Sequence, residues 1–307
     1  MKHIFIVNPV SGKEDASVML IPAIKRVAEG LDYNIELTQY RGHAKELAHK
    51  YADTKEAVRL YACGGDGTLN EVFSGAYGFP LVEVASVPCG SGNDFVRNFG
   101  TAEDFYNLAD NINGTAVPID LMRANGGISA AISSVGIDSD VAFGIPKFRR
   151  IPFCGGQMAY TMSIMQCLCS RLGKRLCIEV NGETIEDVFL LVAICNGIAY
   201  GGGYKAAPTA NVRDGKLELV MVKKISRLRI AGVLDKYKNG EHIKDGEVTK
   251  ELADILTYVQ TQKVKITPID GGQFIVNIDG ECTKTGSLDV EVLPNAAHFV
   301  LPRGICK

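Results

Sequence analysis

Hydrophobic and polar positions follow two periods in the first part of the chain. Short apolar runs of strand length are each followed by a segment in which apolar residues recur at helical spacing. The expected strands cover residues 3–9, 33–40, 57–63 and 81–88, and the expected helices cover residues 17–31, 43–53 and 68–78. A further helix is expected to begin within residues 90–100. This alternation predicts a parallel sheet with helices on both faces and right-handed crossovers.

The pattern changes near residue 120, where strand-like runs separated by turn residues take over. These runs lie at residues 128–137, 175–182, 187–197, 216–222, 263–269, 273–281 and 287–294. Two helical segments interrupt them, at residues 156–172 and from residue 227 onward. The pattern indicates a second, mainly antiparallel domain of sandwich type. We therefore expect one domain in residues 1–122 and another in residues 123–295, with the tail of residues 296–307 returning to the first.

Composition narrows the class of protein. The chain has 307 residues, of which 46% are hydrophobic and 22% charged, as is usual for a soluble globular protein. A net charge of −2 argues against nucleic acid as a partner. The first apolar run is too short for a signal peptide, and no uninterrupted apolar segment is long enough to span a membrane. We expect a cytoplasmic protein, with peripheral contact at the inner face of the membrane as an open alternative.

The nine cysteines do not alter this picture. They are scattered without the spacing of a disulfide framework, and they are read as small buried apolar residues.

Three glycines and one carboxylate stand together where the third expected strand ends: Gly64, Gly65, Asp66 and Gly67. In an open parallel sheet, ligands lie beyond the carboxyl ends of the strands, and glycines followed by a helix N-terminus offer amides to an anion. A carboxylate beside a phosphate is repulsive unless a cation lies between them. Asp66 is thus better explained by Mg²⁺, or by a hydrogen bond to a hydroxyl. From this motif alone, a turn capped by Asp66 and a nucleotide site are equally good interpretations.

A second loop favours the nucleotide site. Gly90, Ser91 and Gly92 offer amides and a hydroxyl, and Asn93 and Asp94 stand where the next helix is expected to start. A helix cap would explain one such loop. Two of them suggest loops that face one another across a crevice. The loop of residues 8–13 ends in Gly-Lys but lacks the Walker A spacing, and "GGDGTLN" does not fit G-x-G-x-x-G, which disfavours a P-loop kinase and a standard dinucleotide fold.

At this point the motifs resemble a known family. "GGDGTLNEV" with "PCGSGND" is similar to the diacylglycerol kinase catalytic domain, in particular to the bacterial soluble lipid kinases. Further segments agree in their order along almost the whole chain: "NPVSG", "TQYRGHAKELA", "GGGYKAAPTANVRDGKLELV" and "NIDGE". The G-G-D-G motif alone is less specific, because NAD kinases and phosphofructokinases share it.

The resemblance implies a fold and an activity. The fold is an ATP-binding, three-layer Rossmann-like α/β domain, related to those of phosphofructokinases and NAD kinases, followed by a mainly antiparallel β-sandwich for the lipid substrate. The activity is transfer of the γ-phosphate of ATP, with Mg²⁺, to a lipid hydroxyl at the membrane surface, as in the conversion of diacylglycerol to phosphatidic acid. An NAD kinase-like enzyme for a soluble metabolite and a catalytically silent regulator are the alternatives. The sequence leaves open whether the chain forms a homodimer.

The resemblance also assigns roles to residues. The nucleotide would be held by Asn8, Thr38, Gly64, Gly65, Asp66, Gly67, Thr68, Leu69, Asn70, Gly90, Ser91 and Asn93. Ser91 replaces the family's usual threonine and keeps the hydroxyl. Asp66 and Asp94 would organise Mg²⁺, with Asp120 joining their charge network, and Asp66 and Glu281 are the catalytic candidates. Glu281 would be the general base, although "DGE" alone reads as a hairpin turn.

A structural metal is implied as well. Asn211, Asp214 and Lys216 match the family's site for it, and Asn211 and Lys216 would contribute backbone carbonyls. A lysine beside a cation requires that its ammonium group point away.

The sequence signals for lipid binding are less specific, because each has two interpretations. Met158, Met162 and Met165 in the second-domain helix suit a pliable acyl-binding surface, or a core helix. The basic segments 147–150 and 223–229 suit anionic headgroups, or a solvated face.

Overall fold

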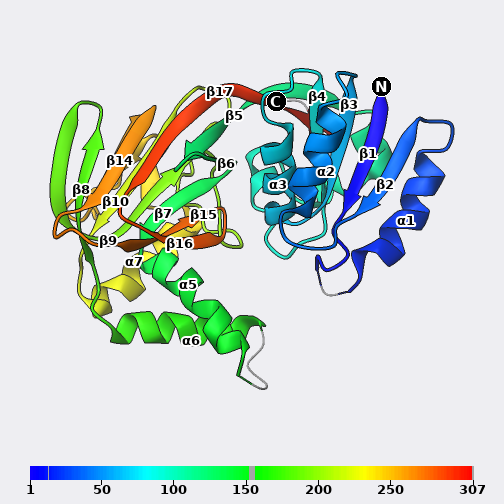
Figure 1. Ribbon diagram of the computed structural model, residues 1–307. Helices are drawn as coiled ribbons and strands as arrows, with labels where there is room; N and C mark the ends of the chain where they lie inside the picture. The colour runs from blue at the N-terminus through cyan, green and yellow to red at the C-terminus, as the bar shows by residue number, and fades with distance from the viewer. Residues whose placement is uncertain (13, 152–155, 306–307) are drawn as a thin grey trace.

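The computed structural model describes residues 1–12, 14–151 and 156–305, so Lys13 of the first predicted loop and the last two residues of the tail lie outside it. Two domains lie side by side, joined by strands that run through both (Figure 1). The N-terminal domain is built on parallel strands β1 (Lys2–Val7), β2 (Tyr33–Leu37), β3 (Val58–Gly64) and β4 (Val82–Pro88), in the order β4-β3-β1-β2.

Helices cover both faces of this sheet, because successive strand residues point to opposite sides. Ile4 and Ile6 pack in one core with α2 (His43–Ala52) and α3 (Asp66–Ala76). Phe5 and Val7 pack in a second core with α1 (Ala16–Val27) and α4 (Leu108–Ile112). The predicted three-layer α/β domain with a parallel sheet is confirmed.

The C-terminal domain is an antiparallel sandwich, as predicted. The small strand β6 (Gly127–Ser129) pairs with the long strand β5 (Thr115–Ala124). The main strands are β7 (Ile132–Gly136), β8 (Lys174–Val180), β9 (Glu183–Cys195), β10 (Leu217–Lys223), β13 (Leu256–Thr261), β14 (Lys263–Pro268), β15 (Phe274–Ile278) and β16 (Glu281–Thr285). A two-stranded ribbon of β11 (Ile243–Lys244) and β12 (Glu247–Val248) stands apart. Helices α5 (Ile137–Arg149), α6 (Gly156–Cys169) and α7 (Arg227–Asn239) lie at one end (Figure 1).

The last strand, β17 (Leu288–Leu301), belongs to both domains. It pairs antiparallel with β14 of the sandwich, and its far end pairs in parallel with β4, through His298 and Phe299. It also pairs with β5 along most of its length. The parallel sheet is therefore completed by the final strand of the chain.

Several elements differ from the sequence-based expectations, among them the segment after Asp94 and helix α5. The segment after Asp94 forms only a short 3₁₀ turn, η1 (Phe95–Asn98), and a second one follows, η2 (Glu103–Phe105). Helix α5 was not expected, because it contains Gly144 and Pro146 and follows directly on a strand. Within the described residues, no helix is both long enough and apolar enough to cross a membrane.

Candidate functional site

The two glycine loops touch one another at the carboxyl ends of β3 and β4. The Cys89 amide donates to the Gly64 carbonyl oxygen at 2.8 Å. A Cβ atom added to Gly90 would lie 2.6 Å from the Cα atom of Gly65, so a side chain there would push the backbones apart. The loops were expected to face one another across a crevice. They are instead packed together into one surface.

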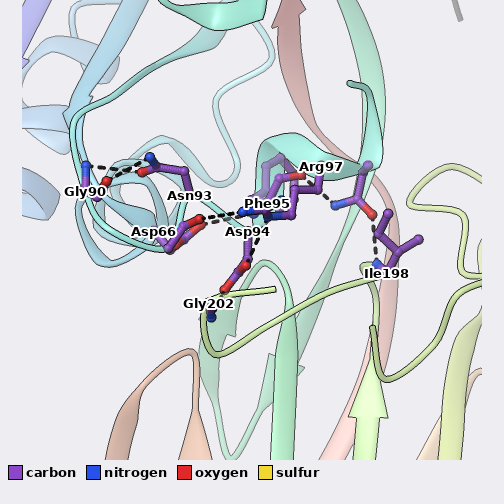
Figure 2. A network of polar contacts seen from close by, with 10 residues as sticks. Asp66, Gly90, Asn93, Asp94, Phe95, Arg97, Ile198 and Gly202 are labelled. Atoms are coloured by element: carbon purple, nitrogen blue, oxygen red, sulfur yellow. Dashed lines mark hydrogen bonds and ion pairs between the residues drawn. The ribbon is translucent and has the colours of Figure 1, made fainter. Parts of the chain in front are cut away.

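Two carboxylates converge beside this surface, Asp94 buried and Asp66 half-buried (Figure 2). Asp66 begins α3 and accepts a hydrogen bond through Oδ1 from the Phe95 amide at 3.0 Å. Asp94 is 5% exposed and accepts through Oδ2 from the Gly202 amide at 2.7 Å. A Cβ atom added to Gly92 would lie 2.9 Å from Asp66 Oδ2 and 3.4 Å from Asp94 Oδ2, so a glycine keeps the space between the two oxygens open.

Burial raises the pKa of Asp66, and the nearby charge of Asp94 raises it further, against the opposing effect of the Phe95 hydrogen bond. Arg97 places a cation beside this pair, with its Nε atom 3.3 Å from Asp94 Oδ1. Two acidic oxygens on an open space fit Mg²⁺, which binds proteins through one or two carboxylates and leaves its other positions to water and phosphate. The described residues contain no cluster of three or more His, Cys, Asp or Glu side chains that could hold a metal by themselves.

The other predicted nucleotide residues lie around these loops. Asn8, just after β1, donates through Nδ2 to Thr68 Oγ1 at 3.0 Å. Asn93 closes the second loop, because its side-chain amide exchanges two hydrogen bonds with the backbone of Gly90, at 3.2 and 2.9 Å. Ser91 is exposed at the tip of that loop. The structure thus brings the three loops together at one edge of the parallel sheet.

Three further residues predicted to bind the nucleotide differ in which of their groups can contact a ligand. Thr38 lies at the end of β2, where its amide donates to the Val7 carbonyl oxygen at 2.9 Å. The side chain of Leu69 is buried in the core under α3, which leaves only its backbone for a ligand. The side-chain oxygen of Asn70 is buried without a hydrogen-bond partner among the described residues. A buried polar atom of this kind is costly unless something binds it.

Glu281 reaches the N-terminal domain through an ion pair. It begins β16, and its Oε1 atom lies 2.8 Å from Nε and 2.5 Å from Nη2 of Arg41. Both side chains are exposed, by 54% for Glu281 and 71% for Arg41. The candidate base is therefore on the surface and is held by a cation of the other domain. Arg41 was not singled out from the sequence, although it lies within the segment "TQYRGHAKELA".

The Arg41 loop is tied to the helix that begins with Asp66. Glu71 of α3 accepts hydrogen bonds from the amides of Gly42 at 2.8 Å and Ala44 at 3.1 Å. Gly42 caps α2 in the left-handed region, with a φ of 89°. Glu71 thus fixes the start of α2, and with it Arg41, relative to α3.

Asp279 has a different role from Glu281, two residues away. Its carboxylate accepts hydrogen bonds from Ser129 Oγ at 2.8 Å and from the amides of Ala130 at 2.6 Å and Ile132 at 2.9 Å. The Ala131 amide donates as well, at 3.1 Å. Asp279 therefore organises the connection between β6 and β7. The sequence signal was present in the "DGE" element, but it did not separate the two acids.

Asp120 does not join Asp66 and Asp94, contrary to expectation. It is 1% exposed, and its two oxygens accept hydrogen bonds from the amides of Gly215 at 2.7 Å and Asn295 at 2.8 Å. The Asp120 amide also donates to the Val212 carbonyl oxygen at 2.7 Å, so Asp120 holds the loop of residues 211–216 in place.

The loop of residues 211–216 holds the three residues of the predicted structural metal site. Asn211 Oδ1 accepts from the Arg213 amide at 3.2 Å, and Asp214 Oδ1 accepts from the Lys216 amide at 3.0 Å. The Lys216 ammonium donates to Gln260 Oε1 at 3.2 Å. The loop is held by its own hydrogen bonds and by those to Gln260 and Asp120, and the metal assignment stays a prediction.

Comparison with known families separates the chain into two matched regions. Residues 2–124 match the diacylglycerol kinase catalytic domain. Residues 131–301 match the YegS C-terminal NAD kinase beta sandwich-like domain. Together these matches span both domains of the structure.

Individual relatives agree with the family matches. A diacylglycerol kinase of Bacillus subtilis (strain 168) is 30% identical over 304 residues, which cover 97% of this chain and 95% of the relative. A diacylglycerol kinase of Staphylococcus carnosus (strain TM300) is 27% identical over 279 residues, covering 90% of this chain and 87% of the relative. The crystal structure of a diacylglycerol kinase from Bacillus anthracis str. Sterne superposes with a TM-score of 0.72 at 21% identity, covering 99% of this chain and 98% of the other, and shows the same fold.

Proposed function

The chain belongs to the diacylglycerol kinase catalytic family of lipid kinases, and from this premise we propose that it transfers the γ-phosphate of ATP to a lipid hydroxyl. Diacylglycerol is the acceptor that the names of the relatives favour, with phosphatidic acid as the product. We propose that the reaction takes place at the cytoplasmic face of a membrane, where such a lipid presents its hydroxyl.

The observation that most directly supports ATP as the phosphate donor is the pair of carboxylates at the joined glycine loops. Asp94 is buried, Asp66 is half-buried beside it, and the space over Gly92 between their oxygens is open. Like charges at short range in a buried site are unfavourable unless a cation or a proton separates them. A divalent cation bound there would neutralise charge on the phosphates of the nucleotide. The glycine loops would hold those phosphates through backbone amides at the start of α3.

The proposed acceptor side is the β15–β16 hairpin. Phosphoryl transfer depends chiefly on placement and charge neutralisation, so a base contributes less than in many other reactions. Glu281 is exposed and hydrogen-bonded to one arginine, so it can exchange that partner for an acceptor hydroxyl. A carboxylate in that position can take the proton of the hydroxyl as transfer proceeds.

The experiment is phosphate transfer from γ-labelled ATP in the presence of Mg²⁺. Acceptors are a panel of lipids in mixed micelles, with NAD in a parallel reaction and with EDTA as the metal-free control. We expect labelled phosphatidic acid that disappears with EDTA and in the Asp66→Asn protein. Labelled NADP would replace the proposal with a soluble-metabolite kinase. ATP binding without transfer to any acceptor would replace it with a regulator.

A further inference from the structure

Residues 200–204 of the sandwich, the triglycine loop, form a tight turn after β9. The backbones of Tyr200 and Tyr204 exchange two hydrogen bonds of 2.9 Å, which close the base of the loop. The three residues between them are Gly201, Gly202 and Gly203, with φ angles of 62°, 84° and 102°. These angles lie in the region that glycine adopts without strain and other residues avoid. The loop therefore has a conformation that depends on its glycines.

The base of the loop is fixed to the sandwich, whereas its tip stands in open space. The Lys205 amide donates to the Lys238 carbonyl oxygen of α7 at 3.1 Å, and the hydroxyl oxygens of Tyr200 and Tyr237 lie 3.5 Å apart. At the tip, a Cβ atom added to Gly202 would meet no atom within 4 Å. The glycines are therefore not needed to make room for neighbouring atoms. They are needed for the direction in which the backbone amides point.

The tip points into the N-terminal domain, at the carboxylate pair (Figure 2). The Gly202 amide donates to Asp94 Oδ2 at 2.7 Å. This is one of the two carboxylate oxygens that border the open space over Gly92. A second contact between the domains lies just before the loop, where the Ile198 amide donates to Asn98 Oδ1 at 2.9 Å. The sandwich thus places a backbone donor directly beside the candidate metal site.

The chemistry of this tip suits an anion. Successive backbone amides in a turn of this kind can form a concave site for phosphate or carboxylate oxygens, and one of them already binds a carboxylate. Among the described residues, no group accepts a hydrogen bond from the amides of Gly201 and Gly203. A divalent cation over Gly92 would compete with the Gly202 amide for the same Asp94 oxygen. The amide would then need another anionic acceptor nearby.

We propose that the triglycine loop is a second phosphate-binding loop, supplied by the sandwich, for the terminal phosphate of the nucleotide. In the free protein the Gly202 amide holds Asp94. Once Asp94 is engaged with a metal, the amide turns to an oxygen of the terminal phosphate. That phosphate faces the acceptor, and the acceptor side of the site also belongs to the sandwich through Glu281. The inference rests on the proposed function, because it assumes that ATP binds at the joined glycine loops.

The test compares the binding of ADP with that of AMP-PNP, an ATP analogue that is not hydrolysed, by calorimetry with Mg²⁺ and without an acceptor. The ratio of the two affinities is the quantity to follow, because both share the same free protein. Gly202→Pro removes the amide hydrogen and cannot adopt a φ of 84°. We expect the preference for AMP-PNP over ADP to fall about tenfold in this variant. Gly202→Ala, which keeps the amide but is strained, should lower it less.

Gly182 provides the matched control. It is exposed in the turn between β8 and β9, has a φ of 82° and also has no atom within 4 Å of an added Cβ. Gly182→Ala should leave the ratio unchanged. A wild-type ratio in both Gly202 variants would overturn the role of the loop while leaving the proposed function in place. A wild-type protein that binds neither nucleotide would overturn both.

Hydrogen exchange of the wild-type protein keeps the test open if the Gly202 variants do not fold. Exchange of the amides in residues 200–204 should slow more with AMP-PNP than with ADP, because only AMP-PNP carries the terminal phosphate. Equal exchange with the two nucleotides would overturn the proposal.

Discussion

The two sides of the candidate site use carboxylates in opposite ways. At the edge of the parallel sheet, Asp94 is buried, Asp66 is half-buried, and both face one small space. On the sandwich hairpin the two acids have separate environments: Asp279 is bound by three amides and a hydroxyl, whereas Glu281 is exposed and bound by one arginine. The sheet edge is suited to hold a cation, and the hairpin pairs a fixed acid with a movable one. Substitutions should separate these roles.

The largest effect is expected at the sheet edge. Asp66→Asn should lower phosphate transfer on the order of 10³-fold, because it removes a charge that would organise the metal beside the phosphates. Initial rates measured against Mg²⁺ concentration check this, and Asp53→Asn, an exposed residue of the same domain, serves as the control. Transfer at the wild-type rate would remove Asp66 from the metal site.

The same substitution should not destabilise the metal-free protein. Because the pKa of Asp66 is raised, the folded protein binds a proton at this carboxyl more readily than the unfolded chain does. The wild type therefore loses stability as the pH rises through the folded-state pKa, whereas Asp66→Asn, which cannot ionise, does not. Urea unfolding should show the variant to be at least as stable at neutral pH, with the difference shrinking in acid.

Glu281→Gln is expected to have the next largest effect, about a 10²-fold loss of kcat. This loss of kcat is at the low end of the losses expected on removal of a general base, because phosphoryl transfer needs little proton removal. Thermal unfolding should hardly change, since an exposed ion pair contributes only ~0–1 kcal/mol. A kcat that stays within a factor of two would show that Glu281 is a turn residue.

Asp279→Ala, by contrast, should lower the stability of the folded protein. It leaves the amides of Ala130, Ala131 and Ile132 without their acceptor, at an expected cost of about 2 kcal/mol in the free energy of unfolding. Urea denaturation gives this value directly. If stability were unchanged while kcat fell, the contrast between the two acids of the hairpin would be wrong.

The smallest effect is expected for Arg41→Ala. Its ion pair with Glu281 is exposed, so the change in unfolding free energy should be below about 1 kcal/mol. If Arg41 only holds Glu281 near the sheet edge, Arg41→Lys should restore most of any lost activity. A loss as large as that of Glu281→Gln would instead indicate that the arginine contacts the substrate.

Periodicity predicted the architecture well, and its failures have local causes. The N-terminal strands are buried apolar runs with helices of clear spacing between them, so their order could be predicted. Helix α5 could not, because Gly144 and Pro146 are poor helix residues that tertiary packing tolerates. Strand β13, "LTYVQT", was missed because half of its residues are polar, two of them exposed and Thr261 buried, so its apolar residues form no clear alternation.

The candidate site was predictable where its residues are close in sequence. The glycine loops each place an acid next to its own strand end, so Asp66 and Asp94 could be proposed together. Arg41 could not be proposed, because its partner Glu281 lies 240 residues further along the chain. The same holds for Asp279, whose acceptor role depends on a loop 147 to 150 residues before it. Such pairs are set by the tertiary fold, between domains for Arg41 and within the sandwich for Asp279, and a single sequence does not state them.

The position of strand β17 has a consequence for folding during synthesis. Synthesis delivers β1 to β4 early, and domains tend to fold from the N-terminus as they leave the ribosome. Yet the strand that pairs with β4 is made much later, so the nascent parallel sheet keeps one unpaired edge until residues 298–299 emerge. An uncovered edge of this kind recruits other chains. The loops that would bind ATP therefore acquire their final support only once β17 has been synthesised, and a chaperone that shields the β4 edge would matter most before that point.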